Sequence, residues 1–135
     1  MARLSWPHFH LLVGVLTAFL ASFGRSENPT SKQALKLAPI QFDVDIDRPD
    51  SQQIDQCSVK STATGTNEAG WIVEGPGGLV LRRFVDTNKD NKVDLWCYYK
   101  NGIEVYRDID ANFNGKADQY RWLGTAGIRW GLDPD

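Results

Sequence analysis

Two short stretches of the sequence carry carboxylate and amide side chains at alternate positions. The first is Asp86–Asp94 (DTNKDNKVD), and the second begins twenty-four residues later as Asp110–Asp118 (DANFNGKAD). Ca²⁺ takes six to eight oxygen ligands at about 2.3–2.6 Å, which a tight loop can supply from side chains at positions 1, 3, 5 and 9 and a main-chain carbonyl at position 7. The sequence therefore predicts two calcium-binding loops. The predicted ligands are Asp86, Asn88, Asp90, Lys92 (through its carbonyl) and Asp94, and then Asp110, Asn112, Asn114, Lys116 (through its carbonyl) and Asp118.

The remaining positions of the two stretches define what kind of loop they form. Position 6 must turn sharply and holds Asn91 or Gly115, two residue types that tolerate positive φ. An EF-hand would need a Glu at position 12, where the sequence has Cys97 and Arg121. The stretches are therefore not EF-hands. Because Asp, Asn and Gly also dominate turns that bind no metal, the alternative is a pair of solvated turns.

The N-terminal segment is typical of a secretory signal peptide, which we place at residues 1–24. Arg3 is its one charged residue, an apolar run covers residues 11–23, and the small residues Ser22 and Gly24 precede the expected cleavage point. The run is short for a membrane span, so an uncleaved anchor is the alternative. The protein is expected to be exported, to a periplasmic, cell-envelope or extracellular location.

Cleavage would remove both histidines, His8 and His10. A Ser-His-Asp device or a His-ligated zinc site would then be excluded, and we predict no catalytic residues and no enzymatic activity. The formal net charge is −2, from 15 basic and 17 acidic residues without a basic block, which argues against a nucleic-acid partner. In an oxidising compartment Cys57 and Cys97 could form a disulfide, and the sequence is equally compatible with two separate thiols.

The segments that flank the two loops, and must position them, are predicted to be short strands. We predict a polar linker over residues 25–55, with one edge strand over Ile40–Ile46 because I-Q-F-D-V-D-I alternates, and a β-repeat domain over residues 56–135. Strands are expected at 56–63, 71–74, 79–85, 93–100, 103–109, 119–123 and 128–132. The loops recur with a period of about 24 residues, and a third begins at Asp133 without being completed, so neighbouring hairpins should stack as repeats.

Asn101-Gly102 predicts a two-residue type I′ hairpin turn. That turn would place Tyr98 opposite Val105, Trp96 opposite Arg107 and Tyr99 opposite Glu104. The aromatic residues recur at matching places in each repeat, so we predict that they form the core rather than a sugar-binding platform. They are Trp96, Tyr98, Tyr99, Tyr106, Tyr120, Trp122 and Trp130.

Several runs resemble a known group of proteins. The pattern D-x-N-x-D, followed by V-D-x-W-x-Y-Y-x-N-G, is similar to acidic-loop β-hairpin repeats of secreted and cell-envelope bacterial proteins. The runs GWIVEGPGG, LRRFVDTN, YYKNGIEVYRDID and IRWGLD resemble the N-terminal region of an uncharacterised family of longer exported proteins. The resemblance covers residues 70–135, and it implies a truncated or short member with acidic metal-binding loops and no known activity.

Together these features predict an all-β fold, in which antiparallel hairpin repeats are joined by Asp/Asn-rich loops and preceded by a signal-peptide helix and a largely irregular linker. The favoured function is an exported, non-enzymatic calcium-binding module in which the ion is structural. The expected partner is the metal ion, and a membrane would be contacted only through an uncleaved signal segment. The alternative is a metal-independent structural or protein-interaction module of the cell envelope.

Overall fold

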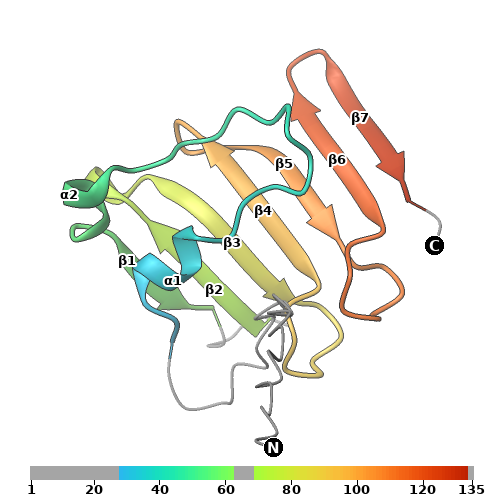
Figure 1. Cartoon of the computed structure of the whole chain (residues 1–135), viewed down its shortest axis with the longest axis horizontal. Helices are drawn as coiled ribbons and strands as arrows, with labels where there is room; N and C mark the ends of the chain where they lie inside the picture. Colours follow the sequence, from blue (N-terminus) through green and yellow to red (C-terminus); the bar gives the residue numbers. More distant parts are fainter. Residues whose placement is uncertain (1–27, 63–68, 134–135) are drawn as a thin grey trace, which may run out of the picture.

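The protein is dominated by one open antiparallel β-sheet. The computed structural model describes residues 28–62 and 69–133, and the predicted signal peptide lies outside these residues. The described strands follow one another across the sheet in chain order, each antiparallel to the next (Figure 1). They are β1 (Ser58–Ser61), β2 (Ala69–Glu74), β3 (Val80–Asp86), β4 (Leu95–Lys100), β5 (Ile103–Ile109), β6 (Gln119–Gly124) and β7 (Gly127–Leu132).

The other described elements are short. Helix α1 (Ser31–Leu35) and helix α2 (Ser51–Ile54) each begin with a capping box, made by Thr30 with Gln33 and by Asp50 with Gln53. A 3-10 turn, η1 (Pro76–Gly78), connects β2 to β3 within the run Gly75-Pro76-Gly77-Gly78, whose residue types favour turns. In the part of the chain that the structure describes, no helix has the length and apolar character needed to cross a membrane.

One face of the sheet carries the core. Residues directly opposite one another in an antiparallel sheet share a face. One row of such neighbours joins Phe84, Trp96, Asp108 and Tyr120, and the next joins Val73, Arg82, Tyr98, Tyr106 and Trp122. The predicted aromatic core is confirmed for Trp96, Tyr98, Tyr106 and Tyr120, which are buried, whereas Trp130 is 64% exposed.

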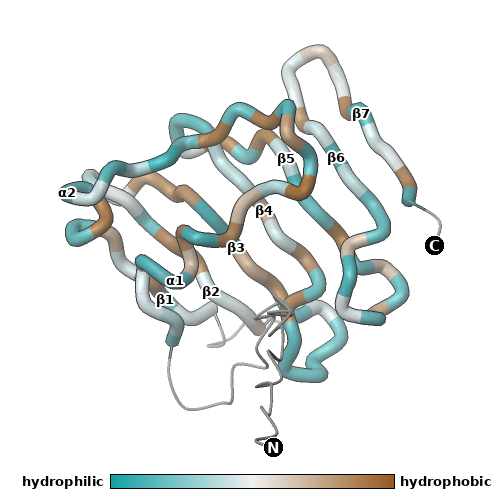
Figure 2. Tube along the Cα trace, in the orientation of Figure 1, coloured by the Kyte–Doolittle hydropathy of each residue, from teal (hydrophilic) through white to brown (hydrophobic). Residues whose placement is uncertain are grey.

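The segment between α1 and α2 covers this core face. We call residues 36–50 the strap, because it runs out across the sheet and returns to α2 (Figure 1), with apolar and polar residues alternating along it (Figure 2). The Ile40 N–H donates to the buried Asp108 carboxylate at 3.2 Å, and Ile46, which is 4% exposed, packs in the core. The stretch predicted as a linker therefore contributes side chains to the core.

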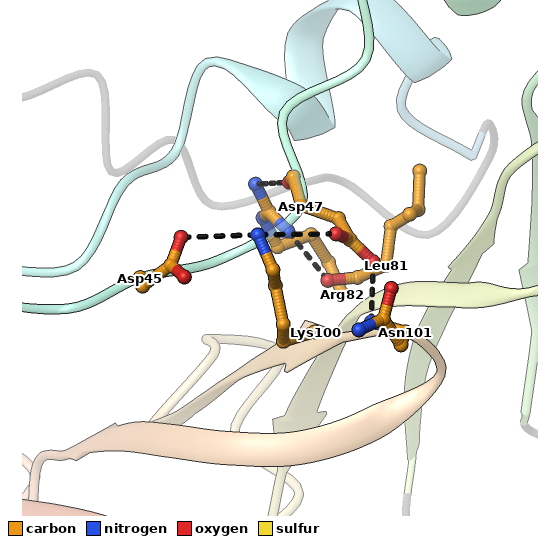
Figure 3. Close-up of polar contacts among 6 residues, drawn as sticks. All are labelled: Asp45, Asp47, Leu81, Arg82, Lys100 and Asn101. Atoms are coloured by element: carbon orange, nitrogen blue, oxygen red, sulfur yellow. Dashed lines mark hydrogen bonds and ion pairs between the residues drawn. The ribbon is translucent and has the colours of Figure 1, made fainter.

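A polar cluster fastens the strap to β3 and the β4–β5 hairpin (Figure 3). The Asp47 N–H donates to the Tyr99 carbonyl at 2.9 Å, and the Asp47 carboxylate accepts from the Asn101 N–H at 2.6 Å. Lys100 Nζ lies 3.1 Å from the Asp45 carboxylate. Arg82, 1% exposed, donates to the Asp47 carbonyl at 2.9 Å and to the Leu81 carbonyl at 2.6 Å.

Arg82 is a cation held in the core by carbonyls and an aromatic ring. Its guanidinium lies 5.5 Å from the centre of the Tyr98 ring, a cation–π distance. Burial lowers the pKa of Arg82 to about 10, which the nearby Tyr98 and Asp47 partly oppose. The charged side chain therefore depends on the strap, since one of its two carbonyl partners belongs to Asp47.

The edge strand predicted over Ile40–Ile46 is wrong. Residues 40–43 bend and residues 44–46 are irregular, so the alternation of the sequence does not place its four apolar side chains on one face. Phe42 is 99% exposed and Ile40 is 57% exposed, whereas Ile46 is buried and Val44 packs against the core. Residues 40–46 pair with neither edge of the seven-stranded sheet, and the segment crosses the face of the sheet instead.

The predicted hairpin turn is confirmed, but most of the register deduced from it is wrong. Asn101 and Gly102 both have positive φ, as a type I′ turn requires, and Tyr99 lies opposite Glu104 as predicted. A β-bulge next to Tyr99 then shifts the pairing by one residue. Tyr98 is opposite Tyr106, and Trp96 is opposite Asp108, so the bulge directs both tyrosines into the core.

The two cysteines are separate thiols, and the disulfide considered from the sequence is not formed. Cys57 precedes β1 and its thiol donates to the Gln53 carbonyl at 3.2 Å, whereas Cys97 lies buried in β4. Three strand spacings of about 4.8 Å separate β1 from β4, more than the Cα–Cα reach of about 7 Å that a disulfide allows.

Candidate functional site

The two acidic stretches form loops at the same end of the sheet. The first connects β3 to β4 and the second connects β5 to β6. In a sheet whose strands alternate in direction, every second connection falls at the same end, which brings these two loops side by side (Figure 1). The first loop is strongly hydrophilic, and the second alternates hydrophilic and apolar residues (Figure 2).

Within the first loop the predicted ligands turn inward and accept main-chain N–H groups. The Asp86 carboxylate accepts from Asp90 at 3.2 Å and from Asn91 at 2.8 Å. The Asp94 carboxylate accepts from Thr87 at 3.0 Å. Shorter-range bonds run from the Asp90 N–H to the Asn88 side-chain oxygen and from the Lys92 N–H to the Asp90 carboxylate, at 3.0 and 2.9 Å.

The second loop makes the same bonds at the same positions. The Asp110 carboxylate accepts from Asn114 at 3.1 Å and from Gly115 at 2.7 Å. The Asp118 carboxylate accepts from Ala111 and Asn112, at 3.3 and 3.2 Å. The Asn112 side-chain oxygen accepts from Asn114, and the Asn114 side-chain oxygen accepts from Lys116. Two different sequences therefore reach one loop conformation.

The backbone of the two loops also agrees. Position 6 has positive φ in both, at 68° for Asn91 and 92° for Gly115, as the sequence predicted. Position 4 has positive φ as well, at 63° for Lys89 and 59° for Phe113. Neither Lys nor Phe favours this region, so the positive φ at position 4 could not be predicted from the residue types.

Main-chain bonds tie each loop to the next. The Asp110 N–H donates to the Asp94 carbonyl at 2.8 Å, and the Asp133 N–H donates to the Asp118 carbonyl at 2.9 Å. The last residue of one acidic stretch is thus bonded to the first residue of the next, and Asp118 is bonded in the same way to Asp133, where we predicted the start of a third loop. This contact keeps the loops at a fixed spacing along the end of the sheet.

The inner carboxylates of the loops are buried without a basic partner. Asp86, Asp94 and Asp110 are 3–5% exposed, and within the described residues none of them lies in an ion pair. Burial raises the pKa of the Asp94 carboxyl, and the neighbouring Asp86 carboxylate raises it further, against the effect of hydrogen bonds from Thr87 and Asn88. The site therefore has uncompensated negative charge, which a bound cation would offset.

The carboxylates do not converge on one point. Among the described residues, no three His, Cys, Asp or Glu side chains are grouped closely enough to hold a metal ion. The first loop would have to supply the Asn88 amide oxygen and the Lys92 carbonyl in addition to its carboxylates, which is the donor mixture that Ca²⁺ accepts. The donor types fit a hard cation, and several oxygens already carry one N–H bond.

A second polar cluster, which sequence reasoning missed, lies beneath the strap. Asp108 is 2% exposed and accepts a short hydrogen bond from the Tyr106 hydroxyl as well as the N–H of Ile40. Burial raises the pKa of the Asp108 carboxyl, and the bond from Tyr106 lowers it. Asp108 lies two residues from both Tyr106 and Asp110. Its side chain faces the core only because the β-bulge next to Tyr99 places it opposite Trp96. We assign this cluster to holding the strap.

Comparisons of the chain with protein-family models, with curated protein sequences and with solved structures found no match. The resemblance to exported acidic-repeat proteins thus stays a prediction. The site and the fold carry the functional argument.

Proposed function

We propose that this chain is an exported, non-enzymatic β-sheet module whose acidic loops bind Ca²⁺ as a structural ion. The observation that carries the proposal is the burial of Asp86, Asp94 and Asp110 at one end of the sheet without a basic partner among the described residues. A buried carboxylate is costly unless it is paired or coordinates a metal. A divalent cation would supply the missing positive charge.

The agreement between the loops supports binding at both. The same positions face inward in each loop and accept the same main-chain N–H groups. An ionised carboxylate offers about four lone-pair sites, so the two Asp86 oxygens, which accept one N–H each, can still ligate an ion. Part of this proposal is that the loops belong to repeats with a period near 24 residues, tied together by the Asp94–Asp110 main-chain bond.

The ion's role would be to stabilise the sheet. Extracellular Ca²⁺ modules bind with dissociation constants of about 10⁻⁴–10⁻³ M. A ligand present at 100 times its dissociation constant adds about 2.7 kcal/mol to stability. When bound, the ion would neutralise facing carboxylates and fix the connections between β3 and β4 and between β5 and β6.

One observation favours the alternative, a metal-independent structural or interaction module. The inward-facing oxygens already accept main-chain N–H groups, so each loop is held by hydrogen bonds that need no ion. The absence of a group of three acidic side chains in the described part of the chain points the same way. The two functions differ in whether stability responds to Ca²⁺.

Thermal unfolding with Ca²⁺ and with chelator tests the proposal. At saturating Ca²⁺ we expect the melting temperature to rise by about 10 °C or more over the value in excess chelator, given the 2.7 kcal/mol above. Mg²⁺ should give a smaller rise, because it demands near-octahedral geometry and dehydrates reluctantly. Equal melting temperatures in Ca²⁺, Mg²⁺ and chelator would favour the metal-independent module.

Reciprocal substitutions between the two loops sharpen the test. Position 5 is Asp90 in the first loop and Asn114 in the second, and both side chains accept the N–H two residues later at 2.9 Å. Asp90→Asn should reduce the Ca²⁺-dependent shift, and Asn114→Asp should enlarge it, while both variants keep that bond. Asp55→Asn, at an exposed position outside the loops, is the control and should leave the shift unchanged.

A further inference from the structure

The outer edge of β7 is an open strand with an apolar face. β7 is the last strand of the sheet, and within the described residues no segment pairs with its outer side. Ile128, Trp130 and Leu132 are 64%, 64% and 58% exposed. They occupy alternate positions along the strand, so their side chains share one face of the sheet. Arg129 lies on the opposite face, where its Cζ is 4.0 Å from the centre of the Trp122 ring. Exposed apolar edge strands are sites where another strand adds.

The two edges of the sheet differ in their protection. β1, at the other edge, has four residues, including Ser58, Lys60 and Ser61, and is polar and exposed. Short length and an exposed Lys are common means of blocking strand addition. β7 has six residues and carries no charge on its apolar face. A strand partner is therefore expected at β7 rather than at β1.

The hydrogen-bonding side of each β7 residue can be deduced. The Asp133 N–H points inward to the Asp118 carbonyl. N–H groups alternate in direction along an antiparallel strand, so those of Gly131 and Arg129 also point toward β6. The N–H groups of Ile128, Trp130 and Leu132 then point to the open edge. The residues with exposed apolar side chains are thus also those whose outward N–H groups face no other described strand.

We propose that β7 pairs with β7 of a second copy of this chain, antiparallel about a two-fold axis at Trp130. This register places Trp130 opposite Trp130 of the partner subunit and Ile128 opposite Leu132 of the partner subunit. All three outward N–H groups of each copy gain acceptors, and the six apolar side chains share one face. Isologous pairing of this kind is the commonest symmetry of homo-oligomers.

Charge disfavours the neighbouring register with its axis at Arg129. With Trp130 on the axis, Arg129 lies opposite Gly131 of the partner subunit and Asp133 lies opposite Gly127 of the partner subunit, so no charged residue of β7 faces a like charge. An axis at Arg129 would place two arginines directly opposite each other, which is destabilising. The strand is therefore self-complementary in side-chain chemistry as well as in hydrogen bonding.

Molar mass measured across concentration tests the proposal. The full chain of 15.2 kDa should double in mass as its concentration rises, in chelator as well as in Ca²⁺, because β7 lies outside the two acidic loops. Independence from Ca²⁺ separates this proposal from the calcium proposal. A mass that stays monomeric up to about 500 µM, which corresponds to a dissociation constant in the millimolar range, would overturn it.

Charge pairs at the axis test the register. Trp130→Lys and Trp130→Glu should each abolish association, because like charges would meet at the axis, and an equimolar mixture of the two should restore it as a heterodimer. Phe42→Lys, at a 99% exposed site on the strap, is the control and should still associate. Association of Trp130→Lys alone, or no recovery in the mixture while circular dichroism shows both variants folded, would overturn the register.

A proline distinguishes edge pairing from stacking of apolar faces. Ile128→Pro removes one outward N–H and adds ring atoms at the open edge, and proline is tolerated on that side of an edge strand. It should abolish the dimer. Ile128→Val retains the N–H and should leave the dimer in place. Dimers of Ile128→Pro as tight as those of the unmodified chain would show that the faces stack and would overturn strand pairing.

Discussion

At the scale of single residues, the two cysteines are in contrasting environments. Cys97 is 1% exposed, and Cys57 is half-buried at the end of α2. Burial raises the pKa of the Cys97 thiol to about 12, with the nearby Glu104 carboxylate adding to the rise. Only the thiolate reacts readily, so the two thiols should differ in reactivity.

We expect a disulfide-exchange reagent at pH 8 to label Cys57 in the folded protein and to label Cys97 only after unfolding. Cys57→Ser should leave no rapidly reacting thiol. Mass spectrometry after timed labelling measures both sites. In denaturant without reductant, the reagent should label two thiols per chain. If it labels no thiol under these conditions, Cys57 and Cys97 are joined by a disulfide.

The burial of Cys97 also predicts how the stability of the protein depends on alkaline pH. The folded-state pKa of Cys97 is raised above its ordinary value of 9.0, so its contribution to stability is fully present below pH 9 and is lost as pH rises toward about 12. Tyr99, whose pKa burial raises to about 12, adds to this loss above pH 10. The slope for one group cannot exceed about 1.4 kcal/mol per pH unit. Urea unfolding at several pH values between 8 and 11 gives the free energy of unfolding as a function of pH, and this free energy should fall less steeply with pH for Cys97→Val than for the unmodified chain. An equally steep fall would contradict the burial of Cys97.

At the scale of elements, the strands of the sheet and their turns lie close to the predicted positions, whereas the edge strand predicted over Ile40–Ile46 is absent. Turn residues such as Gly75-Pro76-Gly77-Gly78 and Asn101-Gly102 mark boundaries through local backbone chemistry, which needs no knowledge of the fold. The bulge near Tyr99 depends on which side chains the core accepts. It places Tyr98 and Tyr106 side by side, with ring centres 5.9 Å apart, and nothing local to either residue requires it.

The hairpin turn gives a test at this scale. Gly102 has φ of 74°, and a Cβ there would lie 3.1 Å from Leu79 Cδ2. Gly102→Ala should lower the free energy of unfolding by about 1–2 kcal/mol, the cost of an L-residue in the left-handed region. At Gly124 the nearest atom to a new Cβ is 3.8 Å away and φ is not positive, so Gly124→Ala should change stability by less than about 0.5 kcal/mol. Urea unfolding compares the two, and equal losses would mean that the β4–β5 turn is not under this constraint.

The candidate site shows the same division between local and non-local information. Alternating Asp and Asn residues predicted which side chains turn inward, because their spacing follows from a tight loop. The burial of Asp86 and Asp110 could not be predicted, since it depends on the stacking of one loop on the next. The role of Asp108 was also out of reach, because its partner Ile40 is 68 residues away in the chain.

At the scale of the whole molecule, the strap turns an open sheet into a two-layer structure. A single sheet must bury one apolar face against another element. Here that element is mostly irregular chain, and it bonds to β5 through Ile40, to β4 through Asp47 and to β7 through Asp43, whose carboxylate lies 2.9 Å from Arg129. The main-chain N–H groups of Ile40 and Asp47 and the Asp47 carbonyl are bonded to the sheet that the strap covers.

The strap can be tested with two apolar residues that the sequence places on one face and the structure separates. Ile46 is 4% exposed in the core, whereas Phe42 is 99% exposed. Ile46→Ala should lower the free energy of unfolding by about 2–4 kcal/mol, through lost burial and the cavity left behind. Phe42→Ala should change it by less than about 0.5 kcal/mol, although it removes more side chain. If residues 40–46 formed an alternating strand with one buried face, both substitutions would lower the free energy of unfolding substantially. Similar losses in urea unfolding would therefore contradict the strap. A large loss at Ile46 alone requires the chain to cross the sheet as an irregular cover.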